Sequence, residues 1–202
     1  AQAVAMNFAM ILDYPPGATP LDPDEIAGLL PKHIVTRGQL NEWELNNVTE
    51  GERWAFGRKH RDILTVRFIC SLHQRMFGET WRWAGTFRKT EKNIGVDPIR
   101  IEAGLQELCA DVKSQLAHHS YPLDELAARF SHRLVSIQPF PNGNGRFSRT
   151  MADLLLVLNG ARRFTWGAAT RAPEADARAR YIEALRAADR RDYGLLFAFV
   201  RS

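Results

Sequence analysis

The chain has 202 residues, of which 45% are hydrophobic, and 27 Lys and Arg residues face 23 Asp and Glu residues. This length and composition fit one soluble globular domain, or one domain with a small appendage, that has a sizeable core. No apolar run reaches the length of a membrane span, which excludes a membrane-spanning protein. A net charge of +4 is too small to indicate nucleic-acid binding by itself, but it suits a site that handles anions.

The N-terminal end is punctuated by prolines and glycine between residues 15 and 23, which indicates a loop. Before it, residues 1–12 are mildly apolar but lack a preceding basic region, so they fit an expression remnant as well as a signal sequence. A short helix capped by Asp22 or Asp24 is expected to end at Leu30. We predict a single domain over residues 1–202, with residues 1–35 as an N-terminal extension and residues 49–199 as the core.

The first half of the core is predicted to be helical. A helix over residues 36–46 offers Leu40, Trp43 and Leu45 for packing, and a long, densely apolar helix is expected over residues 49–75. Gly78 and the segment 81–85 end this long helix. Residues 86–96 read as a short hairpin or extended flap instead, with small and polar residues at its centre.

The second half is predicted to consist of helices over residues 98–119, 123–137, 146–158, 173–188 and 193–199. The fold class expected is therefore all-α, a helical bundle with one small β-hairpin flap. Cys70 and Cys109 are both expected to be free thiols in a reducing compartment, which favours a cytoplasmic protein.

The segment PFPNGNGRFSR, residues 139–149, has the features of a phosphate-binding loop. Pro139 and Pro141 stop the incoming helix, and the glycines let a ligand approach the backbone closely. The next helix begins at once, so its free amide groups and its dipole favour an anion. Arg146 and Arg149 lie on one side of that helix and suit a di- or triphosphate. An Asn-Gly-Asn-Gly run alone is more often a plain turn between helices, but the framing prolines and paired arginines favour the phosphate loop.

This segment resembles the central motif of Fic-domain proteins, which reads His-Pro-Phe, two variable residues, Gly-Asn-Gly-Arg, two more, and Arg. Two further segments are similar to the family: LHQRMFGETWRWAGTFR at residues 72–88 leads into a target-binding flap, and YIEALRAADRRDY at residues 181–193 resembles a C-terminal helix. The likeness covers residues 49–199 and is strongest to a bacterial subgroup called mobile mystery protein B. Most members of the family transfer AMP from ATP to a hydroxyl side chain of a target protein.

The resemblance implies a role for each matching residue. The site residues that it implies for nucleotide binding are Phe140, Asn142, Gly143, Asn144, Gly145, Arg146 and Arg149. Arg146 would pair with phosphate oxygens, Arg149 would reach the γ-phosphate, and Phe140 would anchor the loop inside. The flap that aligns the target segment by strand addition would consist of Lys92, Asn93, Ile94, Gly95 and Val96.

Two positions depart from the family pattern. Gln138 stands where the family has the catalytic histidine that takes the proton from the target hydroxyl. Glutamine has no proton acceptor near neutral pH, so the loss of the general base is expected to slow transfer by about 10²- to 10⁴-fold. Asn142 replaces the usual acidic ligand of Mg²⁺, so the metal is expected to bind mainly through the nucleotide and more weakly. Gln138 is either natural or introduced, and the sequence alone does not separate the two.

Residues 46–51 are similar to an inhibitory helix found in many Fic proteins, in which a glutamate pairs with the second motif arginine. Glu50 and Gly51 match that pattern, whereas Asn46 departs from it. The inhibitory hypothesis therefore predicts a contact between Glu50 and Arg149. The simpler interpretation is that Glu50 is an acidic residue in the first turn of the helix that follows.

Two functions remain open at this point. One is a protein adenylyltransferase that carries AMP from ATP to a Ser, Thr or Tyr hydroxyl of a target protein, inactive or strongly weakened at Gln138. The other is a non-catalytic Fic scaffold that holds ATP as a regulator or as the toxin half of a toxin–antitoxin pair. The expected partners are ATP with Mg²⁺, a target protein, and either an antitoxin or an inhibitory helix of the same chain, but neither a membrane nor nucleic acid.

Overall fold

The computed structural model describes residues 21–34, 36–168 and 173–202, and residues 1–20 of the predicted N-terminal extension lie outside this range. The regular secondary structure of the described part is helical, so the all-α prediction is confirmed. The elements along the chain are α2 (Pro23–Ile26), α3 (Arg37–Phe56), α4 (Val66–Phe77), the 3₁₀ helix η1 (Pro98–Arg100), α5 (Ile101–Ala117), α6 (Leu123–Ile137), α7 (Asn144–Leu158), α8 (Glu174–Asp189) and α9 (Gly194–Val200).

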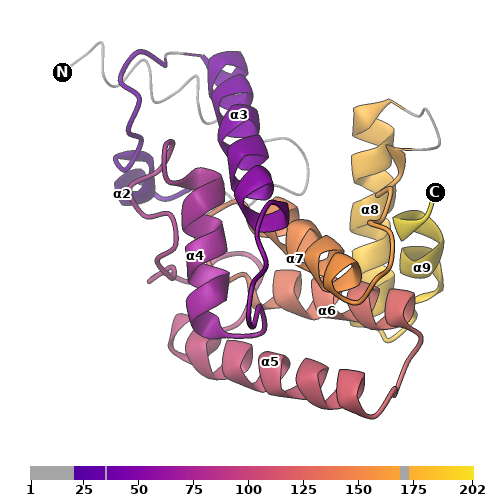
Figure 1. Ribbon diagram of the computed structural model, residues 1–202. Coiled ribbons are helices and arrows are strands. Elements are labelled where there is room, and N and C mark those ends of the chain that lie inside the picture. The colour runs from indigo at the N-terminus through magenta and orange to yellow at the C-terminus, as the bar shows by residue number, and fades with distance from the viewer. Residues whose placement is uncertain (1–20, 35, 169–172) are drawn as a thin grey trace.

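The pair α6 and α7 forms the centre of the bundle, with the two helices packed side by side (Figure 1). On one flank α3 packs against α4, and on the other α8 packs against α9. Helix α5 lies along α6 at the lower edge of the view in Figure 1. The loop between α6 and α7, which carries the predicted phosphate motif, therefore connects the two central helices of the bundle.

The predicted β-hairpin at residues 86–96 is wrong in its secondary structure. No strand occurs in the described residues, whose only β-type pairing is an isolated bridge between Leu29 and Trp81. The two ends of the segment are bonded elsewhere: Arg88 N–H donates to the carbonyl of Pro139 and Val96 N–H to that of Ile137. The segment is thus an extended flap lying along the motif loop, because its terminal backbone groups pair with that loop instead of with each other.

The long helix predicted over residues 49–75 is also wrong, because the chain forms two helices there. Helix α3 already begins at Arg37, so it merges the helix expected over 36–46 with the start of the next. It ends at Phe56, with Gly57 as its C-cap. Thr65 is then the N-cap of α4 and accepts a hydrogen bond from the Phe68 N–H. This cap satisfies a backbone donor that a continuous helix would not leave free.

The buried face of α3 differs from the one predicted. Leu40 is buried as expected, but Trp43 and Leu45 are exposed. The residue buried beside Leu40 is Glu44, one turn further along the same face. An acidic residue on the inner face of a helix has a specific partner in most proteins, and Glu44 has two, which are described below.

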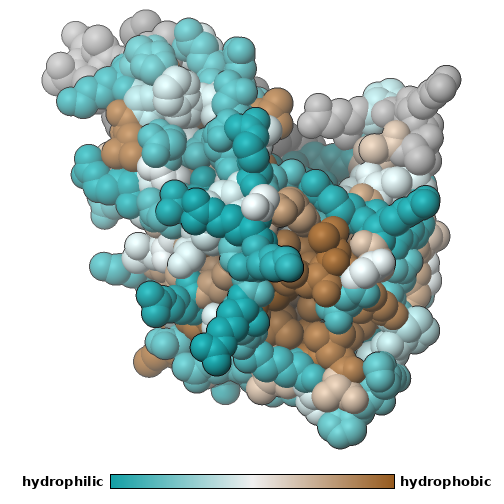
Figure 2. All heavy atoms as spheres, in the orientation of Figure 1, coloured by the Kyte–Doolittle hydropathy of each residue, from teal (hydrophilic) through white to brown (hydrophobic). Residues whose placement is uncertain are grey.

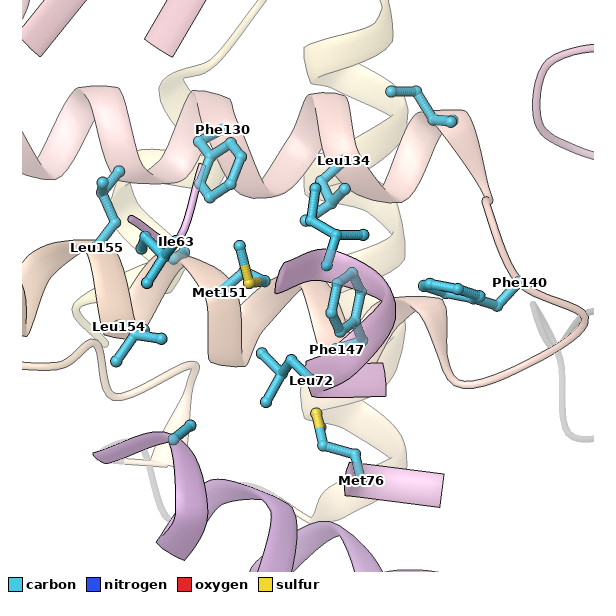
Figure 3. Packing of buried hydrophobic residues seen from close by; sticks show 14 of the residues in the cluster. Ile63, Leu72, Met76, Phe130, Leu134, Phe140, Phe147, Met151, Leu154 and Leu155 are labelled. Carbon is cyan, nitrogen blue, oxygen red and sulfur yellow. The ribbon is translucent and has the colours of Figure 1, made fainter. Parts of the chain in front are cut away.

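The core lies between α4, α6 and α7, and the motif loop contributes to it directly. Figure 3 shows Phe147 and Met151 of α7 between α6 and the side chains of Leu72 and Met76 from α4. In the same view the ring of Phe140 points inward from the loop before α7. Phe140 and Phe147 meet edge to face at 5.4 Å, so the loop is anchored by an aromatic side chain that is fully buried.

The surface in the orientation of Figure 1 is mainly hydrophilic over α2 and α3, and its apolar side chains gather in a hollow nearer the centre (Figure 2). Val157 and Leu158, which end α7, are among the exposed apolar residues. Within the described segments no helix combines the length and apolarity needed to cross a membrane. Both cysteines, Cys70 and Cys109, are free, and burial raises the pKa of each thiol to about 11.

Candidate functional site

The motif loop is a tight connection between α6 and α7. Gln138 follows the last residue of α6 and adopts a left-handed conformation with φ of 50°. Gly143 precedes α7 and has φ of 80°, a region that favours glycine. Helix α7 begins at Asn144, two residues earlier than predicted, so the glycine-rich part of the motif is the first turn of the helix itself.

The first turn of α7 has backbone amide groups without a partner among the described residues, and the space beside Gly145 is open. The described residues provide no hydrogen-bond partner for the backbone N–H of Asn144, Gly145 or Arg146. A methyl group built on Gly145 would meet no other atom within 4 Å. The positive end of the α7 dipole is therefore free on this side, as an anion-binding helix start requires.

The side chain of Asn144 does not face this open space. Its Oδ1 accepts a hydrogen bond from Phe140 N–H at 3.0 Å, and its Nδ2 donates to the Phe140 carbonyl at 2.8 Å and to Gln138 Oε1 at 2.9 Å. These three bonds use the buried carboxamide to fix the shape of the loop. The structure thus places the Asn144 side chain as a brace inside the loop, and only its backbone N–H is available to a ligand.

Gln138 is buried, and both the nitrogen and the oxygen of its carboxamide form a hydrogen bond. Its Nε2 donates to the Val135 carbonyl at 2.8 Å, and its Oε1 accepts from Asn144. Gly95 of the flap lies directly against it, because a methyl group on Gly95 would come within 2.7 Å of Gln138 Cβ. Residue 138 therefore lies between the flap and the start of α7.

Arg146 is held by a carboxylate that the sequence did not predict. Its Nη2 donates to Glu44 Oε2 at 2.7 Å, while the other Glu44 oxygen accepts from Trp81 Nε1 at 2.7 Å. The guanidinium also lies over the Phe77 ring at 5.0 Å. The side chain of Arg146 remains 32% exposed, so its other N–H groups face outward while Glu44 fixes its direction. The spacing of Glu44 from Leu40 on the buried face of α3 was the available signal for this role.

Replacing Glu44 with alanine is expected to lower the free energy of unfolding by about 2 kcal/mol, since it leaves the indole N–H of Trp81 and one face of Arg146 without their partner. Urea denaturation of the variant measures this change. Glu42→Ala is the matched control on the exposed side of the same helix and should stay within about 0.5 kcal/mol of the unmodified protein. Equal effects of the two substitutions would contradict the structural role of Glu44.

Arg149 is the second arginine of the motif, and no carboxylate in the described part of the chain pairs with it. Its guanidinium lies over the ring of Tyr181 at 5.4 Å, and no described carboxylate is within ion-pair distance. The predicted contact with Glu50 is not formed, because Glu50 pairs with Arg53 along the same helix and both side chains are largely exposed. A partly buried arginine that rests on an aromatic ring without a counter-ion is available to an incoming anion.

His73 of α4 contacts the motif loop at Asn142 and Phe140. The Gly85 N–H donates to its Nδ1 at 3.0 Å, and its Nε2 lies 3.1 Å from the Asn142 carbonyl. Its ring stacks on Phe140, with the centroids 3.7 Å apart. Complete burial, with a smaller contribution from the Arg146 charge, lowers the pKa of His73 to about 3, although the bond to Asn142 opposes that shift. His73 is therefore neutral, and it belongs to the segment 72–88 that the sequence had already singled out.

Arg88 ties the flap to the motif loop. Its guanidinium is buried and donates to the carbonyls of Gln138 at 2.6 Å, Thr90 at 2.8 Å and Val96. The Gln138 carbonyl belongs to the C-terminal end of α6, where a positive charge is favourable. Of the predicted flap residues 92–96, Gly95 and Val96 thus lie beside the end of α6, and Arg88 bonds the Val96 carbonyl.

Lys92 fastens the same flap to the N-terminal segment. Its Nζ donates to Asp22 Oδ2 at 2.9 Å and to Glu25 Oε2 at 2.6 Å, and its side chain is only 4% exposed. Thr90 also donates to Asp22. Of the flap residues, Lys92 is thus an internal anchor, whereas Asn93, Ile94 and Gly95 are exposed.

Lys92→Met is expected to speed amide exchange of residues 90–96 roughly 10-fold, because it removes two charge-assisted bonds to α2. The exposed Lys89→Met is the matched control and should leave exchange unchanged. The bonds from Thr90 and Lys92 lower the pKa of Asp22 below its ordinary value of 3.8, so this stabilisation is present at neutral pH and is lost as the pH falls below that value. Unchanged exchange in Lys92→Met would rule out the anchor.

Comparison with known proteins agrees with this geometry. Residues 63–156 match the model of the Fic/DOC family. Protein adenylyltransferase fic-1 of Caenorhabditis briggsae is 32% identical over 108 residues, which cover 51% of this chain and 21% of that protein. Protein adenylyltransferase Fic of Aedes aegypti is 29% identical over 104 residues, covering 49% of this chain and 21% of that protein. The matching part of the chain thus spans about a fifth of the length of these curated relatives.

Solved Fic domains have the same fold. The N-terminal Fic domain of Bep8 from Bartonella sp. 1-1C superimposes with a TM-score of 0.66 at 18% identity, covering 95% of this chain and 94% of that one. BepC from Bartonella tribocorum with bound AMPPNP gives a TM-score of 0.68 at 16% identity, covering 89% and 97%. The N-terminal Fic domain of a cell filamentation protein from Bartonella quintana with bound ADP gives 0.66 at 16% identity, covering 84% and 86%. The chain thus carries a segment that matches the Fic/DOC family model, residues 63–156, within a fold shared with solved Fic domains.

Proposed function

We propose that the chain binds ATP at the start of α7 and is a protein adenylyltransferase whose transfer step is strongly weakened at Gln138. The observation that carries the proposal is the open first turn of α7, with its unpaired N–H groups beside Arg146 and Arg149. Curated relatives named protein adenylyltransferases and related structures that hold ADP or AMPPNP support the same ligand class.

The phosphate groups would be bound by the helix and two arginines together. The amides of Gly145 and Arg146 would donate to phosphate oxygens, with the helix dipole adding to their effect. Arg146 would offer the N–H groups that Glu44 leaves free, and Arg149 would turn from the Tyr181 ring toward the terminal phosphate. The proposal assigns no phosphate contact to the Asn144 side chain, because its three bonds inside the loop already use it.

Mg²⁺ is proposed to arrive with the nucleotide. Asn142 is the motif residue in the metal position, and its side-chain oxygen lies 2.6 Å from the Gly143 N–H. The described residues contain no cluster of three His, Cys, Asp or Glu side chains that would hold a metal. One neutral amide oxygen fits a magnesium ion whose other ligands are phosphates and water, so the metal would neutralise phosphate charge and the protein would add little affinity.

The target hydroxyl would approach residue 138 from the flap. The flap runs past Gln138 with Gly95 in contact, and the exposed residues around Ile94 would lie along the target segment. Transfer to the hydroxyl needs a base that accepts its proton, and the Gln138 carboxamide cannot accept a proton near neutral pH. Its oxygen can accept a hydrogen bond and orient the hydroxyl, which leaves binding intact while the proton transfer is slow.

Arg149→Met tests the nucleotide site. We expect the dissociation constant for ATP to rise about 10- to 100-fold, because charge-assisted bonds to the terminal phosphate are lost. Isothermal titration calorimetry measures this constant, with Arg67→Met, an exposed arginine of α4, as the control. The same ATP affinity in both variants would exclude Arg149 from the phosphate site.

A further inference from the structure

The neutral His73 links two segments that the proposed reaction needs at the same time. A backbone N–H can only donate, so the bond from Gly85 means that Nδ1 of His73 is the acceptor. The ring proton of the neutral imidazole must then be on Nε2, and this nitrogen donates to the Asn142 carbonyl at 3.1 Å. The hydrogen bonds therefore define the tautomer, with one ring nitrogen for each segment.

The bond to Asn142 also sets the direction of the next amide. In a trans peptide the C=O and N–H point in opposite directions, and the chain has no cis peptide among the described residues. Because the Asn142 carbonyl faces His73, the Gly143 N–H must face away from it. The Gly143 N–H donates instead to the side-chain Oδ1 of Asn142 at 2.6 Å.

We propose that His73 is a positioning residue of the nucleotide site: its Nε2–H fixes the Asn142–Gly143 peptide so that the Gly143 N–H is presented to a phosphate oxygen, and its Nδ1 holds the root of the flap at Gly85. The phosphate oxygen takes the place of the Asn142 side-chain oxygen. This inference rests on the proposed function, since it assigns the orientation of the phosphate site to one buried side chain of α4.

The packing around the ring supports a positional role. His73 is wholly buried between Phe140, whose ring is stacked at 3.7 Å, and Phe77, whose ring centroid lies at 4.6 Å. A buried ring packed against two aromatic neighbours cannot turn its nitrogens to other partners without repacking of the core.

The test compares three variants by their ATP affinity. His73→Phe keeps an aromatic ring but loses both hydrogen bonds, and we expect ATP to bind about 10- to 100-fold more weakly. His73→Gln can accept from Gly85 and donate to Asn142, so it should recover most of that loss. His132→Phe is the control, because His132 is a buried histidine of α6 that bonds Asp189 instead of the motif loop. It should retain ATP affinity even if its stability falls.

A spectroscopic measurement separates this inference from the proposed function. Long-range ¹H–¹⁵N correlation spectra of the unmodified protein at neutral pH should show His73 protonated at Nε2 alone. A ring protonated at Nδ1 would overturn the inference whether or not ATP binds. Equal ATP affinity of folded His73→Phe and the unmodified protein would overturn it as well. Failure of the unmodified protein to bind ATP would instead overturn the proposed function.

Discussion

Gln138→His is expected to increase transfer of AMP from ATP to protein by about 10²- to 10⁴-fold, the usual contribution of a general base. The left-handed conformation at residue 138 accepts histidine, one of the side chains enriched there. The imidazole would lie where the Gln138 carboxamide now accepts from Asn144, beside Gly95 of the flap. Incubation with labelled ATP and lysate, followed by counting of protein-bound label, measures the gain.

Gln138→Asn is the matched control for this experiment. Asparagine also accepts a left-handed conformation but has no titratable base, so its labelling should stay at the level of the unmodified protein. Labelling by the histidine variant alone supports a disabled transferase. If neither variant labels protein although both bind ATP, the chain is a nucleotide-binding scaffold and the transferase proposal is wrong.

Gly143→Ala is expected to lower the free energy of unfolding by about 3 kcal/mol. Alanine at φ of 80° is strained, and its methyl group would lie 2.5 Å from the Phe77 ring. Phe77 is itself buried in the core, so it cannot retreat without a cost from repacking. Urea denaturation monitored by circular dichroism measures the change.

Gly145→Ala tests the glycine whose Cα faces open space, in contrast to Gly143, whose Cα packs against Phe77. Its methyl group would meet no atom within 4 Å, so stability should be unchanged or higher by up to about 1 kcal/mol. The methyl would stand in the open space before the α7 amides, and we expect ATP affinity to fall about 10-fold or more. If Gly145→Ala destabilised the chain as much as Gly143→Ala, or left ATP affinity intact, this division would be wrong.

The sequence predicted the bounds of α6 because prolines flank its apolar pattern on both sides. The helix expected over residues 123–137 is α6 (Leu123–Ile137), because Pro122 precedes it and Pro139 follows it. The prediction was wrong between residues 49 and 75, where the apolar pattern continues through the loop between α3 and α4. Ile63 and Leu64 are buried in that loop, so periodicity alone could not distinguish them from helix residues.

The motif was predictable because its chemistry is local, whereas its supports come from distant segments. Gly143 and Arg149 belong to one short stretch whose glycines, prolines and arginines all indicate a phosphate loop. Glu44 lies 102 residues before the arginine that it holds, and His73 lies 69 residues before the carbonyl that it bonds. A pattern in the sequence does not indicate such pairings, since each depends on how α3 and α4 pack against the loop.

Titration of ATP with Mg²⁺ into the isotope-labelled, unmodified chain, followed by ¹⁵N NMR, tests the central claim most directly. We predict saturable shifts that fit one site and are largest at the amides of Gly143, Gly145 and Arg146, with adenosine producing far smaller changes at the same positions. The absence of saturable shifts at these amides up to millimolar ATP would contradict the assignment of the α7 start as a nucleotide site.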